Sequence, residues 1–177
     1  MRAFLVRLPS GTRYWTVVDE CFEVVGPPDS FLLEMRLARG RAETTTKAYA
    51  EGVSLSLRWC LRTGRDWKTT ARDMGLFIPW LRWTGGDTGQ TIVVPGPGSN
   101  PVRSDARINK ILTAVRLLLL HAVANKQAPA WVLEQIYEIG GTCDLPLEAR
   151  GEGGGLRHRL MSISANAVFN APAATMS

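Results

Sequence analysis

One amphipathic stretch, residues 104–121, constrains the fold of this chain more than any other feature of its sequence. At about 100° per residue, its apolar residues fall on one broad side of a helix: Ile108, Ile111, Leu112, Val115, Leu118, Leu119 and the following Ala122. A helix with such a side must bury it against other elements. Ser104 or Asp105 can cap its first turn, and Asn125 and Lys126 close it. We therefore expect this helix to be the centre of a helical core.

The opposite side of the same helix carries Asn109, Lys110, Thr113 and Arg116, with no carboxylate among them. Packing against a core does not require such a ribbon of hydrogen-bond donors. Cationic side chains bind phosphates, whereas amide and hydroxyl groups can bind base edges. This side is therefore a candidate surface for nucleic acid, and the alternative is a helix face that only meets solvent.

The rest of the chain predicts a small, mostly helical domain. Two short β-type runs, residues 4–7 and 14–18, flank a turn signal and predict a β-hairpin. Apolar residues at helical spacing predict four further helices, at residues 31–39, 44–62, 70–83 and 130–139. Asp29 or Ser30 is the expected cap of the first of these, and Gly64 the end of the second. The expected fold class is all-α: a four- to five-helix bundle preceded by a short N-terminal hairpin.

This reading divides the chain into three parts. Residues 1–27 are the hairpin extension, residues 28–140 the helical domain and residues 141–177 a tail. Residues 85–102 are rich in Gly and Pro and predict a long loop within the domain. The tail is Gly-rich and then Ala- and Ser-rich, without an apolar period, and is expected to be disordered.

The composition favours an anionic partner. The 177 residues carry a formal net charge of +5, and 17 of the 21 basic residues are Arg. The planar fork of Arg suits phosphate and guanine. A GC-rich genome would produce the same preference for Arg over Lys, so the bias counts only in part toward nucleic acid.

Several classes of protein are disfavoured. The three cysteines are widely spaced, and neither histidine lies near a second ligand type, so we expect no metal, cofactor or disulfide scaffold. Cys60 falls on an apolar helix face and is expected in the core. No run of about 18 apolar residues exists, so we expect no membrane span, and Arg7 interrupts the N-terminal run too early for a signal peptide. A cytoplasmic location fits best.

Three segments together resemble the core-binding domain of tyrosine recombinases, the phage-integrase family. Thr45-Thr46-Lys47-Ala48-Tyr49 resembles the opening T-x-x-x-Y helix of that domain. Gly64-Arg65-Asp66-Trp67 and the helix after it resemble its second helix, and residues 107–116 resemble its long helix. The similarity spans roughly residues 28–140, and it rests on the order and spacing of the segments more than on any single motif.

The resemblance implies a SAM-like helical bundle that forms one half of a C-shaped clamp on duplex DNA. Two of its helices would face the major groove. Carried over by position, the candidate DNA-binding residues are Thr45, Thr46 and Lys47 in the first helix and Arg107, Asn109, Lys110, Thr113 and Arg116 in the second. The implied partners are double-stranded DNA and other recombinase protomers, with no membrane and no small-molecule substrate.

The chain departs from this family where catalysis is concerned. Family members carry a second domain with an Arg, a Lys, a His-x-x-Arg box and a nucleophilic Tyr. His158 is followed by Arg159-Leu160-Met161, so the His-x-x-Arg spacing is absent. We therefore expect no enzymatic activity and a truncated recombinase. The alternative function is a helical protein–protein interaction module that does not bind DNA, with an exposed apolar patch at Trp80, Trp83 and Leu120.

Overall fold

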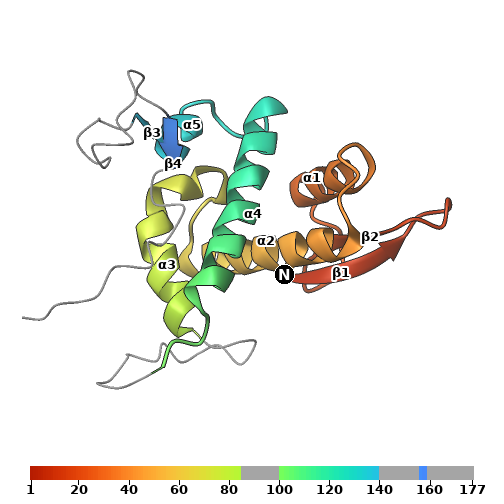
Figure 1. Cartoon of the computed structure of the whole chain (residues 1–177), viewed down its shortest axis with the longest axis horizontal. Helices are drawn as coiled ribbons and strands as arrows, with labels where there is room; N and C mark the ends of the chain where they lie inside the picture. Colours follow the sequence, from red (N-terminus) through yellow and green to blue (C-terminus); the bar gives the residue numbers. More distant parts are fainter. Residues whose placement is uncertain (85–99, 140–155, 159–177) are drawn as a thin grey trace, which may run out of the picture.

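The computed structural model describes residues 1–84, 100–139 and 156–158, and these are mostly helical (Figure 1). The elements, in chain order, are β1 (Arg2–Arg7), β2 (Arg13–Val18), α1 (Gly26–Leu37), α2 (Glu43–Thr63), the 3-10 helix η1 (Trp67–Asp73), α3 (Met74–Trp83), α4 (Asp105–Ala124), α5 (Val132–Ile136), β3 (Tyr137–Ile139) and β4 (Leu156–His158). The prediction of a mostly helical chain with an N-terminal β-hairpin is confirmed.

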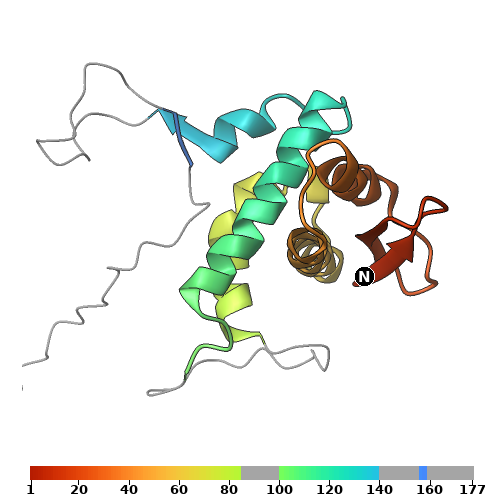
Figure 2. The ribbon, with the colours of Figure 1, turned by 45° about the vertical axis from the view of Figure 1, so that its right-hand side comes forward.

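Helix α4 is the centre of the molecule, as predicted. The Ser104 hydroxyl caps it by accepting a hydrogen bond from the Arg107 backbone N–H, 3.4 Å away. In Figure 1, α3 and α5 lie to the left of α4, α1 and the hairpin lie to its right, and α2 crosses it. Figure 2 also shows α5 and α1 on opposite sides of α4. The central helix thus packs against α1, α2, α3 and α5, and Lys110 on its remaining side is exposed.

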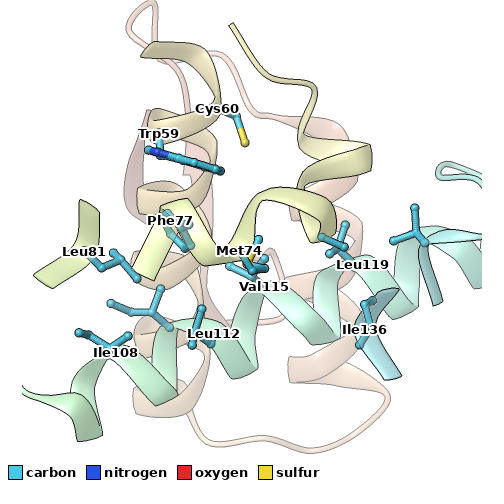
Figure 3. Packing of buried hydrophobic residues seen from close by; sticks show 13 residues of the cluster. Trp59, Cys60, Met74, Phe77, Leu81, Ile108, Leu112, Val115, Leu119 and Ile136 are labelled. Carbon is cyan, nitrogen blue, oxygen red and sulfur yellow. The ribbon is translucent and has the colours of Figure 1, made fainter. Parts of the chain in front are cut away.

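The apolar side of α4 is divided between two clusters. The first joins it to α2, η1, α3 and α5 (Figure 3), and its members on α4 are Ile108, Ile111, Leu112, Val115 and Leu119. The second joins it to β2, α1 and α2, and its members on α4 are Ala114 and Leu118. The sequence predicted a single apolar side, because a helical wheel does not show how many elements will cover it.

Helices α2 and α4 cross in close contact at Gly52. A Cβ atom at this position would lie 3.3 Å from the Cα of Ile111 and 3.3 Å from the Cβ of Ala114. The glycine therefore allows the two helices to approach. Gly64, at a φ of +66°, caps the end of α2 in the left-handed conformation, which confirms its predicted role. Cys60, near this end, is buried as expected.

The hairpin is part of the core. Its strands pair antiparallel from Arg2 opposite Val18 to Arg7 opposite Arg13, as predicted. Val17 of β2 lies in the second cluster beside Phe31 of α1. The boundary drawn at residues 27/28 therefore falls inside α1 and does not separate the hairpin from the helices.

Helix α1 begins at Gly26, earlier than expected, and Asp29 does not cap it. Proline is favoured in the first turn of a helix because its φ is already helical and its missing N–H has no partner there, so Pro27 and Pro28 start α1 instead of ending the hairpin. Asp29 Oδ1 accepts hydrogen bonds from the hydroxyls of Tyr14, at 2.9 Å, and Thr16, at 2.7 Å. This carboxylate joins the hairpin to α1.

Tyr14 is expected to make folding stability depend on pH in alkaline solution. Burial, and then the hydrogen bond and negative charge of Asp29, raises the pKa of Tyr14 from 10.0 to about 12. The phenol ionises near pH 10 in an unfolded chain, so its stabilising effect is complete below about pH 10 and is lost as the pH rises toward 12. The difference in unfolding free energy between the wild type and Tyr14→Phe should therefore decrease over this range. A difference that stays constant would contradict the contact.

Two predicted helices differ in the structure. The one expected at residues 70–83 is the 3-10 helix η1 followed by α3, because the Asp66 side chain accepts from the Lys68 N–H at 3.0 Å and starts a tighter turn. The one expected at 130–139 stops at Ile136, and Tyr137–Ile139 pair as β3 with Leu156–His158. The expected tail thus contains a strand. The remainder of the tail, and residues 85–99 of the expected loop, lie outside the described residues.

Candidate nucleic-acid interface

A groove of about 440 Å³ lies between the first turns of α2 and the middle of α4. Its walls are Thr44, Thr45, Ala48 and Tyr49 from α2 and Asn109, Lys110 and Thr113 from α4. It therefore brings together four of the predicted site residues, Thr45, Asn109, Lys110 and Thr113, from both helices. The groove presents hydroxyl, amide and ammonium groups among methyl groups and one aromatic ring.

The groove follows from how α4 is packed. Since the two clusters occupy its other flanks, the strip carrying Asn109, Thr113 and Arg116 is left outward at spacings of four and three residues. The Thr113 hydroxyl donates to the Asn109 carbonyl at 2.8 Å. On the α2 side, the ring of Tyr49 stacks on Phe31, with centroids 6.4 Å apart. The groove is thus built on rigid helices and anchored in the second cluster.

The other four predicted site residues do not line this groove. Thr46 is fully buried and its hydroxyl donates to the Glu43 carbonyl, so its predicted contact with DNA is wrong. Lys47 lies about 200° around the helix from Thr45, and its Nζ sits 5.0 Å from the centre of the Trp15 ring on the hairpin. Thr45, Thr46 and Lys47 are consecutive on α2 and therefore face different neighbours. The sequence motif that contains them does not show which of the three faces the groove.

Arg107 and Arg116 take different places on α4. Arg107 points toward α2, where its Nη2 bonds Glu51 Oε2 at 2.6 Å. Arg116 is half-buried, one turn beyond Thr113 on the same strip. Only Arg116 therefore continues the outward strip that leads away from the groove.

A second hollow contains basic residues that the sequence alone does not mark as a site. It has a volume of about 300 Å³ and is lined by Arg2, Ala3, Glu51, Ser54, Leu55, Arg58, Arg103 and Arg107. Except for Arg107, none of its arginines was a candidate. These arginines come from segments far apart in the chain. The local signals are the helical spacing of Glu51, Ser54 and Arg58 on one face of α2 and the spacing of four residues between Arg103 and Arg107.

The apolar patch expected for the alternative function is partly exposed. Trp80, Trp83 and Leu120 are each only partly exposed, and Trp80 stacks on the buried Phe77 at 5.8 Å between centroids. The large exposed apolar side chains near the hairpin are Phe4, Leu5, Phe22 and Val24. Other large apolar side chains are exposed in separate segments, namely Leu37, Leu61, Leu76, Val102 and Trp131. The hairpin is where several of them lie close together in the chain.

The described ranges contain no group of three or more His, Cys, Asp or Glu side chains that could hold a metal ion. Over the same ranges, no helix has the length and apolar character needed to cross a membrane. Comparison of the chain with protein-family models, with curated proteins and with solved structures found no match.

Proposed function

We propose that this chain binds duplex DNA through the groove between α2 and α4, as the core-binding half of a site-specific tyrosine recombinase. The observation that supports this most is the convergence of Thr45 with Asn109, Lys110 and Thr113 in one groove. Asn109, Lys110 and Thr113 lie together because of their spacing on α4. The added observation is that Thr45, from a separate segment that resembles the same family, lies across the groove from them.

Each wall of the groove has a role in this proposal. Lys110 is exposed and pairs with a backbone phosphate. The Asn109 amide is the group best suited to an adenine edge, which it can bind through two hydrogen bonds. The methyl groups of Thr45 and Thr113 provide apolar contact for a thymine methyl. Lys110 positions the duplex, and Asn109, Thr45 and Thr113 contact the edges of its bases.

The proposal includes no cleavage of DNA by this chain. Tyr14 is held by Asp29, and the raised pKa of its phenol disfavours the phenolate that a nucleophile needs. The ring of Tyr49 packs on Phe31. Tyr49 shares the groove with one cationic side chain, that of Lys110, and the proposal gives this tyrosine no catalytic role.

Duplex binding should weaken steeply with salt. Each phosphate that the protein neutralises releases counterions, so log Kd should rise with log salt concentration by about 0.9 per contact. The measurement is fluorescence anisotropy of a labelled mixed-sequence duplex of about 20 base pairs, two helical turns, from low to physiological salt. Affinity that does not change with salt would contradict DNA binding.

The second candidate function, a protein-interaction module, is favoured by the exposed apolar side chains around the hairpin. Phe22 is 59 % exposed and Val24 52 %. In this case the same anisotropy experiment would detect no duplex binding, and replacement of Phe22 and Val24 by serine would abolish binding to the partner without unfolding the chain.

A further inference from the structure

The second hollow is shallow and open to solvent, and it is strongly basic. Four arginines, Arg2, Arg58, Arg103 and Arg107, line it together with a single carboxylate, that of Glu51. They come from β1, α2, α4 and the residues just before α4. Bringing four like charges together costs free energy, which the carboxylate of Glu51 offsets only in part. Arg2 and Arg58 also line a hollow that contains Asp19 and Glu20. The excess of positive charge therefore points to an anionic ligand.

At least three of these guanidinium groups are held in place by the fold, and that of Arg2 lies 3.8 Å from the centre of the Phe22 ring. Arg103 Nη1 donates to the carbonyls of Leu81 and Thr84, both at 2.7 Å, and so ties the end of α3 to the start of α4. Arg107 Nη2 is bonded to Glu51. An Arg side chain carries five N–H donors, so a fork held through one nitrogen keeps further donors for a ligand and loses little freedom on binding it.

The arginines are also close enough to influence one another. Burial, and then the positive charges of Arg107 and Arg58, lowers the pKa of Arg103. The cations therefore repel each other across the hollow. A bound anion would reverse this effect and stabilise the cluster.

The hollow lies next to the proposed DNA groove. On α2, Glu51 comes one turn after Ala48 of the groove; on α4, Arg107 comes one turn before Lys110. The two concave sites therefore adjoin along the seam between the same two helices. A duplex seated in the groove would bring its backbone past the hollow.

We propose that the hollow lined by Arg2, Arg58, Arg103 and Arg107 binds a phosphate group, and that its position assigns this phosphate to the backbone of the duplex held in the adjacent groove. This inference rests on the proposed function. Planar guanidinium forks match the oxygens of a phosphate better than a lysine does. Glu51 limits the affinity, since it competes with the phosphate for Arg107.

The experiment uses two variants with opposite expected effects on duplex binding. Arg2→Gln removes an exposed donor and should weaken binding of the mixed-sequence duplex several-fold and lower the salt slope by about one. Glu51→Gln removes the competing carboxylate and should tighten binding several-fold. The matched controls are Arg72→Gln on η1 and Glu134→Gln on α5, both exposed, which make the same charge changes elsewhere. A change that only damaged the fold would not increase affinity.

A second probe, inorganic pyrophosphate at constant ionic strength, tests whether the ligand of the hollow is a phosphate of the DNA backbone or a small phosphate compound. Binding to the folded state raises the Tm, so the wild type should show this rise and Arg2→Gln should not. If pyrophosphate acts through Arg2 but the variants leave duplex affinity unchanged, the site takes a small phosphate and the backbone assignment is wrong.

If Arg2→Gln and Glu51→Gln change neither the rise in Tm with pyrophosphate nor the affinity for the duplex, the hollow binds no phosphate. That result would overturn the inference. A wild-type chain that binds the duplex while these two variants match their controls would leave the proposed function standing and overturn this inference alone.

Discussion

Replacing Phe77 with alanine is expected to lower the free energy of unfolding by about 3–5 kcal/mol. Phe77 is completely buried in the first cluster, where its ring centroid lies 4.9 Å from that of Trp59 (Figure 3). The centroid of the Trp80 ring lies 5.8 Å away. Deleting the ring removes apolar burial and leaves a cavity between α2 and α3. Since small domains are stable by only about 5–15 kcal/mol, the variant should be close to unfolding.

The control is the preceding residue in the same helix. Leu76 is 56 % exposed, so Leu76→Ala should change stability by about 0.5 kcal/mol or less. Urea denaturation followed by tryptophan fluorescence measures both, because Trp59 reports on the same cluster. Similar losses in the two variants would contradict the packing of α3 described here.

Reversing the charge of Lys110 is expected to have the largest effect on DNA binding. Lys110→Glu removes a phosphate contact and places a negative charge in the groove, so Kd for the mixed-sequence duplex should rise about tenfold or more, or about 1.4 kcal/mol. The side chain is exposed and belongs to neither cluster, so the fold should be unaffected. The measurement is anisotropy at low salt.

Lys68→Glu is the matched control for this variant. Lys68 is also exposed and lies on η1, an element that does not contribute to the groove, and the substitution changes the net charge by the same amount. Equal losses of affinity in both variants would show that only the total charge matters and would contradict a localised site.

Local sequence signals predicted the elements whose ends are determined by their own residues. Ser104 caps α4 through its own hydroxyl, and Gly64 ends α2 by adopting a φ that other residues avoid. The turn between the two first strands likewise lies in adjacent residues. In each case the interaction that decides the structure spans only a few positions.

Features decided by distant contacts could not be predicted. The sequence predicts that Asp29 or Ser30 caps a helix. In the structure, the carboxylate of Asp29 instead accepts hydrogen bonds from Tyr14 and Thr16 of the hairpin. The turn of α2 that carries the T-x-x-x-Y motif places Thr45 in the groove and Thr46 in the interior. The arginine hollow assembles positions from β1, α2 and the start of α4, which are far apart in the chain.

The most direct test of DNA binding at the groove is a titration of the ¹⁵N-labelled protein with the mixed-sequence duplex, followed by NMR. Chemical-shift changes should concentrate at Thr44–Tyr49 and Asn109–Thr113 and extend to the arginines of the hollow, while α3 and α5 remain unaffected. Chemical-shift changes confined to other elements would show that DNA does not bind in the groove between α2 and α4. The absence of any shift changes, at concentrations where anisotropy detects binding, would show the same.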